Sequence, residues 1–257
     1  MSSMLKNFFK KHLLKLHFIK KLAVATVVNQ NLLASVINNI KPDDLRKTLF
    51  LPISNFSSQN NQDIFALLVN NFNKGFFIEI GANDGFTYSN TIYLEENYNW
   101  NGILIEANPK YLNSLNNRKN SIVINQAVYK DIGTIEFCDA GLYGGIQSSI
   151  DPLHSKYTTN SNIIKVECNT LIELISKHKK SIPDIIDFIS IDVEGLELII
   201  VEQLLTLPFK IKCGVVEVNK RNMETKEITK LLQNAGYTID NRYSVNQDLY
   251  FYNNSLL

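Results

Sequence analysis

Cysteine is scarce in this sequence, and the few cysteines present are not paired. The 257 residues contain three, Cys138, Cys168 and Cys213, which stand far apart and form no C-x-x-C motif. Two of them lie in strand-like runs, where a buried thiol is the ordinary interpretation. This distribution gives no support for a disulfide framework, and a reducing, cytoplasmic environment fits it best.

Long apolar runs are also missing. The longest, Leu22–Val28, contains one threonine and is far shorter than the ~20 residues that a membrane span requires. A signal peptide would need a small-x-small cleavage site after such a run, but Asn29–Asn31 follow instead. The sequence therefore predicts neither a transmembrane helix nor a cleaved leader.

Residues 4–28 nevertheless have the pattern of an amphipathic helix. Their apolar residues recur three to four positions apart, with lysines beside them. One interpretation is an extra helix packed on the domain or on a partner subunit, for example in a homo-oligomer. The other is a peripheral helix on the inner membrane face, where each lysine near anionic lipid contributes ~1 kcal/mol. The stripe consists of Leu5, Phe8, Phe9, Leu13, Leu16 and Ile19.

Acidic residues are absent from the first 41 positions, which contain seven lysines. Because the whole chain has 26 Lys and Arg against 25 Asp and Glu, the remainder carries 19 basic and 25 acidic residues. A body of net negative charge is a poor match for a phosphate backbone. We therefore do not expect nucleic acid as a substrate.

From residue 75 onwards the pattern alternates between strand and helix. This alternation predicts an α/β fold with one core and a doubly wound, mostly parallel sheet. We expect the domain at 63–257, preceded by a helical extension and connector at 1–62. Strands are expected at 76–80, 102–106, 121–125, 186–191 and 213–218, with last strands at 236–237 and 248–252, and helices near 89–97, 109–117, 195–205 and 223–235. Two strand-like runs, 134–138 and 163–168, interrupt the alternation around a long insertion at 139–162.

The turn after the first strand reads Gly81-Ala82-Asn83-Asp84-Gly85 and is typical of a nucleoside site. Glu79 precedes it, and Glu106 closes the next strand at the spacing at which a carboxylate binds ribose hydroxyls. A dinucleotide site would show G-x-G-x-x-G, and a carboxylate beside the loop would repel a pyrophosphate. The cationic amino-acid end of S-adenosylmethionine (SAM) suits it better, and a nicotinamide or flavin nucleotide is the alternative.

Further polar residues follow the later strands, whose carboxyl ends meet at one edge of an open sheet. Gln126 and Ala127 follow the third strand, where they could lie along an adenine edge. Asp192, Glu194 and Glu217 converge from the next two strands. Glu194 has a simpler explanation, because an acid near a helix N-terminus is favoured there anyway.

If a hydroxyl accepts a group in this site, its proton needs a base, for which the candidates are Asp192, Glu217 and the loop histidine His154. The same three acids could instead hold Mg²⁺ or Mn²⁺, although no histidine-containing ligand cluster supports a metal site. Residues 144–149 are either a lid that covers the acceptor or a flexible glycine loop. Arg118 and Arg221 are expected at the surface, where either could meet a phosphate on a lipid-linked or nucleotide sugar.

Five segments together resemble the FkbM family of SAM-dependent methyltransferases. They are Phe77–Gly85, Ser89-Asn90-Thr91, Trp100–Gly102 with Ile105-Glu106, and Asp187–Gly195, and the resemblance covers roughly 75–240. It implies a class I methyltransferase fold, with a seven-stranded sheet whose last strand is antiparallel, and O-methylation, often of sugar hydroxyls. It also implies that Glu79, Gly81, Asn83, Gly85 and Glu106 hold SAM and that Asp192 stands beside the methyl group. Ala107 and Ser190 depart from the proline and lysine that many members have there.

We therefore expect a SAM-dependent O-methyltransferase whose acceptor is a free or lipid-linked saccharide or a similar glycan. The alternative is a non-catalytic, membrane-associated subunit of a glycan-assembly complex. Methylation of nucleic acid is disfavoured, because the fourth strand ends in Asp-Val-Glu-Gly rather than Asn-Pro-Pro-aromatic. The expected SAM ligands are Glu79, Gly81, Ala82, Asn83, Asp84, Gly85, Asn90, Glu106, Ala107, Gln126, Ala127 and Asp192. The expected acceptor ligands are Gln147, Ser148, Ser149, Glu194 and Asn219.

Overall fold

The computed structural model describes residues 57–150, 158–218, 222–241 and 248–257. The chain divides into two compact units, Met1–Asn55 and Phe56–Leu257, and all described residues belong to the second. Residues 57–62, assigned to the connector from the sequence, are thus part of this unit. The expected helix at 4–28 and the residues His154, Asn219 and Arg221 lie outside the described residues.

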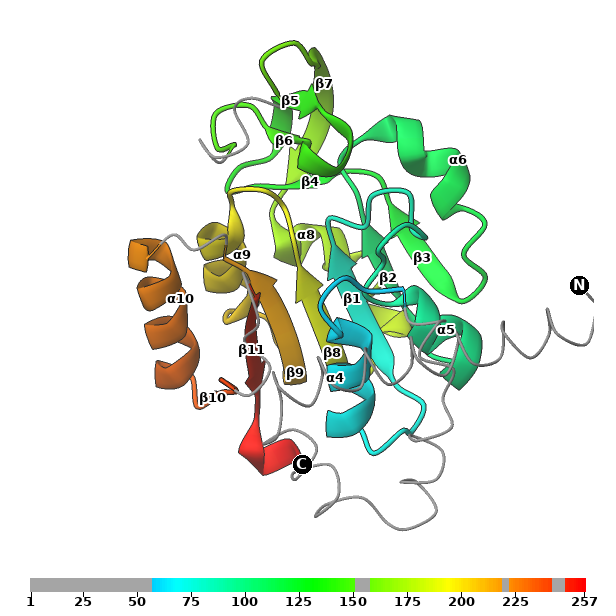
Figure 1. The fold of residues 1–257 in the computed structure, drawn as a ribbon, viewed down its shortest axis with the longest axis vertical. Coiled ribbons are helices and arrows are strands. Elements are labelled where there is room, and N and C mark those ends of the chain that lie inside the picture. Colours follow the sequence, from blue (N-terminus) through cyan, green and yellow to red (C-terminus); the bar gives the residue numbers. More distant parts are fainter. Residues whose placement is uncertain (1–56, 151–157, 219–221, 242–247) are drawn as a thin grey trace, which may run out of the picture. The chain divides into compact units, whose positions relative to one another are not determined.

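Seven strands form the main sheet, in the order β10-β11-β9-β8-β1-β2-β3 (Figure 1). Within this sheet β11 is antiparallel to both neighbours, and the other strands pair in parallel. The expected α/β fold, with a mostly parallel seven-stranded sheet and an antiparallel last strand, is confirmed. The strands are β1 (Phe76–Ile80), β2 (Asn101–Ile105), β3 (Ser121–Ile124), β8 (Ile185–Ile191), β9 (Lys210–Glu217), β10 (Thr238–Ile239) and β11 (Asp248–Tyr252).

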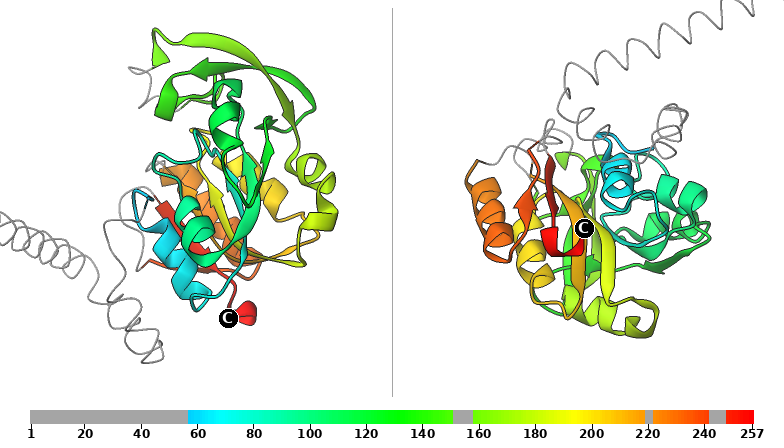
Figure 2. Two further views of the ribbon diagram at one scale, coloured as in Figure 1. Left: turned by 90° about the vertical axis from the view of Figure 1, so that its right-hand side faces the viewer. Right: turned by 90° about the horizontal axis from the view of Figure 1, so that it is seen from below.

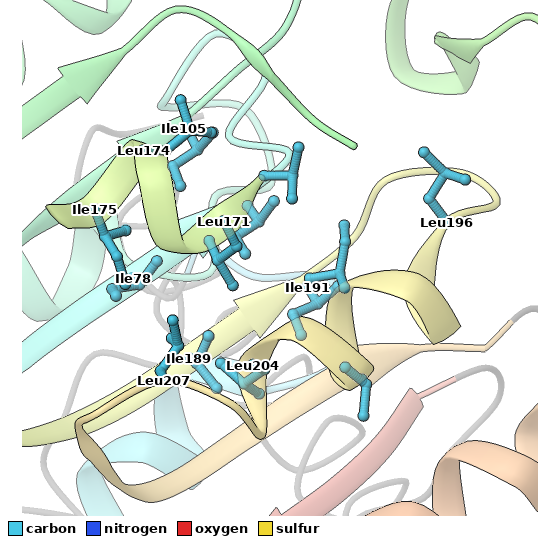
Figure 3. Close-up of a cluster of buried hydrophobic side chains, with 14 of the residues drawn as sticks. Ile78, Ile105, Leu171, Leu174, Ile175, Ile189, Ile191, Leu196, Leu204 and Leu207 are labelled. Carbon is cyan, nitrogen blue, oxygen red and sulfur yellow. The ribbon is translucent and has the colours of Figure 1, made fainter. Parts of the chain in front are cut away.

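Three helices pack on one face of this sheet: α8 (Leu171–Ser176), α9 (Glu197–Leu204) and α10 (Asn222–Asn234). Figure 3 shows Leu171, Leu174 and Ile175 of α8 packed near the strand residues Ile78 and Ile105. Strand side chains alternate between faces, so alternate residues of β1 join this core. The sequence did not predict α8, whose first turn is capped by the Thr170 side chain.

Two helices, α4 (Gln62–Val69) and α5 (Ile92–Tyr98), lie on the opposite face (Figure 2). The Phe65 ring of α4 meets the Tyr250 ring of β11 edge-on, with centroids 5.0 Å apart. Trp100, before β2, is fully buried and donates its indole N–H to the Asn73 carbonyl at 3.0 Å. Because Glu79 alternates with Ile78 along β1, its side chain points to the face that α5 covers.

A second sheet of four strands lies beyond the carboxyl ends of the main-sheet strands (Figure 1). The two strand-like runs that interrupt the alternation pair here as antiparallel β5 and β7. Their partners are two-residue strands, β6 beside β5 and β4 beside β7. The strands are β4 (Ala127–Val128), β5 (Gly133–Asp139), β6 (Gly145–Ile146) and β7 (Asn162–Asn169).

The remaining differences from the expected elements are small. The strand expected at 236–237 lies two residues later, as β10. The helix expected at 109–117 is a 3₁₀ turn, Pro109–Tyr111, followed by the short α6 (Leu112–Leu115). The helix expected from residue 89 begins at Ile92, because residues 89–91 form a hydrogen-bonded turn around Glu79. In the described part of the chain, none of the helices has both the length and the apolar character that a membrane span requires.

Candidate active site

A cavity of about 270 Å³ opens at the carboxyl ends of the main-sheet strands, where the second sheet adjoins them. Parallel strands direct the loops that follow them to this edge, where open α/β sheets bind ligands. The cavity is lined by residues at the carboxyl ends of β1, β2, β8 and β9, by the turns after the first three of these strands, and by Val128, Phe137 and Ile146 of the second sheet. Glu79 and Glu106 both line it, together with Asp192 and Glu217.

The turn after β1 fits closely against the neighbouring strands. Gly81 has a φ of +86°, and a Cβ at this position would lie 1.7 Å from the Asp192 carbonyl oxygen. Only glycine fits such a contact at a left-handed φ. The N–H groups of Gly81 and Ala82 both donate to the Ile105 carbonyl at the end of β2, at 2.9 and 3.2 Å. These donors are therefore engaged by the protein itself and do not form a cradle for a pyrophosphate.

Glu106 joins the ends of β1 and β2. Its Oε2 accepts the Asn83 N–H at 2.8 Å, and its Oε1 accepts the Asn108 N–H at 2.7 Å. Burial raises the pKa of Glu106 to about 7, although the two N–H donors oppose the shift. A carboxylate offers about four lone-pair positions, so Glu106 has acceptor capacity left for a ligand in the cavity.

Glu79 is the buried centre of the turn before α5. Its Oε1 accepts the Asn90 N–H at 2.9 Å, and its Oε2 accepts the hydroxyls of Thr91 and Ser89 at 2.5 and 3.2 Å. Burial raises its pKa, and the positive charge of Arg118 opposes that shift. The carboxyl lines the cavity but already has several protein donors, so it fixes the turn in addition to facing any ligand.

Arg118 is the counter-ion of this region, and the expectation that it lies at the surface is wrong. Its side chain is fully buried and pairs with Glu95 at 3.0 Å. The same guanidinium donates to the Gly85 carbonyl at 2.7 Å and to the Thr91 hydroxyl at 3.0 Å. Arg118 is thus connected through Thr91 to Glu79. It does not line the cavity, so it cannot serve as the phosphate ligand that an exposed arginine would be.

Asp192 and Glu217 form a carboxyl pair at the ends of β8 and β9. The Asp192 carboxyl donates a hydrogen bond to Glu217, and burial together with the charge of Glu217 raises the pKa of Asp192 well above its ordinary value. Burial raises the pKa of Glu217 to about 7. Two neighbouring carboxyls cannot both ionise readily, so the pair retains a proton near neutral pH.

Glu194 completes this group from the turn after β8. One oxygen each of Asp192, Glu194 and Glu217 lies within 4.8 Å of the others. Glu194 has a φ of +59°, which is unusual for a residue with a side chain and is often found at functional sites. Glu197 holds the turn by accepting the Val193 and Gly195 N–H groups at 3.3 and 3.0 Å. Oxygen ligands of this kind suit Mg²⁺, but no histidine or cysteine of the described residues joins the three acids.

Ser190, which stands where many members of the resembled family have lysine, forms a hydrogen bond with Asn90. The Asn90 side-chain amide donates to the Ser190 hydroxyl at 2.8 Å, and both residues are buried and line the cavity. A lysine at position 190 would place an ammonium group beside this amide. The two polar residues therefore belong to one contact, although they are separated by 100 positions in the sequence.

The other expected site residues fall into three groups. Ala82, Ala107, Gln126 and Ala127 line the cavity. Asp84 and Gly85 do not line it: Asp84 accepts the Phe86 and Thr87 N–H groups, and a Cβ at Gly85 would lie 2.9 Å from Leu115. Gln147, Ser148 and Ser149 do not line it either, and the parts of that loop that do are Gly141–Gly144 and Ile146. His154 and Asn219 lie outside the described residues.

Sequence reasoning missed one wall of the cavity, formed by Gln59, Asn60 and Gln62 before β1 and by Asp248 of β11. The Gln62 amide donates to Asp248 at 2.9 Å, across 186 positions of sequence. Burial raises the pKa of Asp248 to about 6. An acid at the start of the apolar run Asp248–Tyr252 was a usable signal for Asp248, whereas nothing in the sequence marks the glutamines.

We compared the chain with known protein families, sequences and structures. No curated protein sequence matches the chain. Three solved structures are similar at low identity. The methyltransferase FkbM from Methylobacillus flagellatus KT is 15% identical with a TM-score of 0.44, over 70% of this chain and 44% of its own. Aeropyrum pernix fibrillarin with natively bound S-adenosyl-L-methionine is 11% identical with a TM-score of 0.40, over 75% and 76%. The N-terminal domain of human METTL16 in complex with SAH is 13% identical with a TM-score of 0.42, over 75% and 68%.

This chain thus covers less than half of the Methylobacillus protein. The family comparison is more decisive. The model of the methyltransferase FkbM domain matches residues 79–239, which is more than half of the chain and runs from Glu79 at the cavity to the end of β10. This chain belongs to the methyltransferase FkbM domain family.

Proposed function

We propose that this protein is a SAM-dependent O-methyltransferase that acts on a hydroxyl of a saccharide or a glycan-like acceptor. The main support for the proposal is that Glu106 and the Asp192–Glu217 pair line one cavity. In addition, the N–H groups of Gly81 and Ala82 already donate to the Ile105 carbonyl and are not available to a pyrophosphate. A site with this arrangement suits a nucleoside with a positively charged tail rather than a pyrophosphate.

The residues present fit SAM, which supplies a methyl group on a positively charged sulfonium when it is bound. Glu106 can accept both ribose hydroxyls with the lone pairs that Asn83 and Asn108 leave free. Small and apolar residues next to Glu106, namely Ala107, Ala127 and Val128, offer an adenine contact. The Asp192–Glu217 pair retains one proton and one negative charge, which gives the middle of the cavity a negative potential that favours a cationic ligand.

Glu217 is the residue best placed to receive the acceptor's proton. Bound SAM would supply the methyl group for a new O–C bond at the expense of its S–C bond, and the Glu217 carboxylate would take the hydroxyl proton. A base works best with a pKa near the working pH, and burial raises the pKa of Glu217 to about 7. Asp192 orients Glu217 through their shared hydrogen bond. Positioning of the acceptor oxygen in line with the methyl group supplies the rest of the acceleration.

Calorimetric titration of the full chain with SAM tests the cofactor. We expect binding in the micromolar range, weakened about 100-fold in Glu106→Ala by the loss of two charge-assisted hydrogen bonds. Glu136→Ala, an exposed β5 residue outside the cavity, is the matched control and should bind normally. A folded wild-type protein that binds no SAM would overturn the proposal.

Methylation of a panel of sugars, followed by mass spectrometry with and without a chelator, tests the reaction. Transfer to a sugar hydroxyl supports the proposal, and insensitivity to the chelator supports Glu217 as the base. Loss of activity with the chelator would assign the Asp192–Glu194–Glu217 group to a metal instead. Transfer to a nitrogen or carbon acceptor would refute O-methylation.

A further inference from the structure

The ionisable Asp and Glu side chains that line the cavity have no basic side chain among them in the described part of the chain. Six carboxyl side chains line it, and among the described residues no lysine, arginine or histidine does. The nearest buried cation, Arg118, is bound to Glu95 and to the turn before α5. Lys110 pairs with Asp139 outside the lining. The six acids are Glu79, Glu106, Asp192, Glu194, Glu217 and Asp248.

The two ends of the cavity lie over different strands. Glu106 follows β2, whereas Glu217 ends β9 and Asp248 begins β11. β2 and β9 are separated by β1 and β8, which makes three strand spacings, or about 14 Å. If SAM lies with its ribose at Glu106, as the proposed function has it, the β9–β11 end is left for the acceptor.

The wall at this acceptor end is held in place by side-chain amides. Gln62 donates to Asp248 at 2.9 Å and accepts the Asn60 N–H at 2.9 Å, and the Tyr250 hydroxyl donates to the Asn60 carbonyl at 2.8 Å. Gln59 stands beside them on the cavity wall, is exposed, and makes no hydrogen bond to the described residues. Its amide is therefore available to a ligand hydroxyl.

Tyr88 lines the same cavity from the turn after the glycine loop, and this turn adjoins the segment of Gln59, because the Ser57 hydroxyl donates to the Ser89 carbonyl at 2.8 Å. Its side chain is 52% exposed, although its ring is large and apolar. Its backbone has a φ of +58°, a strained conformation for a bulky residue. An exposed aromatic ring held by a strained backbone at a cavity offers a flat surface for a ring-shaped ligand.

We propose that Tyr88, Gln59 and the Gln62–Asp248 pair form the acceptor subsite, and that this subsite takes an uncharged or amine-bearing sugar ring and rejects phosphorylated and carboxylated sugars. The proposal rests on the proposed function. The ring stacks on Tyr88 and its hydroxyls bond to Gln59, which leaves one hydroxyl for Glu217. An anionic substituent would lie against the carboxyls of Glu217 and Asp248, with no described cation to balance it.

The test compares methyl transfer by the full chain to matched sugars: a neutral methyl glycoside, the amino sugar, the uronic acid and the sugar phosphate. We expect kcat/KM for the anionic sugars to be at least about 100-fold below that of the neutral one, since like charges brought together cost several kcal/mol. Tyr88→Ala should raise the acceptor KM about three- to tenfold. Tyr88→Phe should retain the wild-type KM, and the SAM affinity should be unchanged in both variants.

Phe86→Ala is the matched control, because Phe86 is an exposed aromatic residue of the same turn that does not line the cavity. It should leave the KM for the acceptor unchanged. Gln59→Arg should raise the relative kcat/KM for the sugar phosphate. Saturation-transfer NMR with the free sugars gives a readout independent of turnover, in which the neutral and amino sugars bind and Tyr88→Ala weakens them.

The outcomes separate this proposal from the proposed function. Failure of SAM to bind overturns the cofactor assignment itself. Normal SAM binding with methylation of an anionic sugar as fast as its neutral counterpart overturns only the charge selectivity of the subsite. Equal effects of Tyr88→Ala and Phe86→Ala on the acceptor KM would remove Tyr88 from it. Normal SAM binding without methylation of any sugar would overturn both the saccharide acceptor and the subsite.

Discussion

Replacement of Arg118 by methionine should destabilise this protein more than removal of any exposed cation. The Arg118 side chain is fully buried, and its Nε and Nη2 atoms both lie 3.0 Å from Glu95 Oε2. It also donates to the Gly85 carbonyl and to the hydroxyls of Ser89 and Thr91. Methionine keeps much of the apolar volume but removes the charge and every donor.

The size of the stability loss can be estimated from the buried Glu95 carboxylate, which loses its counter-ion in this variant. Breaking a buried ion pair by removing one partner costs about 3–5 kcal/mol, because the other charge remains buried without compensation. Glu95 is only 4% exposed, so little water can reach it. Its remaining donors, the N–H groups of Lys119 and Asn120 and the Ser121 hydroxyl, moderate this cost. We therefore expect the free energy of unfolding to fall by about 4 kcal/mol, a large part of the ~5–15 kcal/mol typical of a domain.

Urea unfolding at neutral pH measures this loss, with Lys110→Met as the control. Lys110 is also paired with an acid, Asp139, but its side chain is 41% exposed. An exposed pair contributes about 0–1 kcal/mol, so the control should shift the midpoint little. Arg118→Lys keeps the charge with fewer donors and should fall between the two. It also provides a measurable variant should Arg118→Met fail to fold.

A double-mutant cycle identifies the source of the effect. Glu95→Gln in the Arg118→Met background removes the stranded charge and should restore part of the lost stability, giving a coupling free energy of about 1–3 kcal/mol. The reasoning is refuted if Arg118→Met costs no more than Lys110→Met. It is also refuted if the two substitutions are additive, since the arginine would then act independently of Glu95.

Three further predictions concern the residues at the ends of the strands. Gly81→Ala should destabilise the protein by more than about 3 kcal/mol in thermal unfolding, because its Cβ would overlap a carbonyl oxygen at a φ of +86°. Gly133→Ala, with no atom within 4 Å of the added Cβ, should change stability by less than about 1 kcal/mol, and equal losses in the two variants would contradict the contact. Glu217 has a folded pKa of about 7 against 4.5 in the unfolded chain, so its contribution to stability is complete below pH 4.5 and is lost as pH rises through 7, by about 3 kcal/mol in all. Glu217→Gln should flatten this slope between pH 5 and 8, and an unchanged slope in urea unfolding would exclude Glu217 as its source. Asn90→Ala should cost about 1–3 kcal/mol by leaving the buried Ser190 hydroxyl without its donor, and Ser190→Ala in the same chain should recover part of that loss in the same unfolding assay.

The sequence was sufficient for the centre of the main sheet because the central strands are buried on both faces. The run at 76–80 contains four apolar residues and one acid, and all five residues are buried in β1. Such runs, separated by helical periods, leave few arrangements other than a parallel sheet. The second sheet was not predictable in the same way, because the pairing of β5 with β7 joins Gly133 to Cys168 across an insertion. Each run by itself is compatible with several partners.

The sequence predicted some features of the candidate site but not others. Glu79, Gly81 and Glu106 were found from their spacing, because residues at the ends of adjacent parallel strands meet whatever the rest of the chain does. That spacing does not reveal how many donors a carboxylate already has. Glu79 and Glu106 were expected only as ligand contacts, and the structure gives each a second role in holding the loops together.

The sequence by itself determined the alternation of strands and helices, apart from α8, and the acids that face one edge of the sheet, since apolar period and spacing are local properties. Only the tertiary structure decided that Arg118 is buried beside Glu95, that Gln62 meets Asp248, and that Tyr88 faces the cavity. The physical reason is that the burial of a polar side chain depends on partners that satisfy it. Those partners come from distant parts of the chain, and no local pattern identifies them.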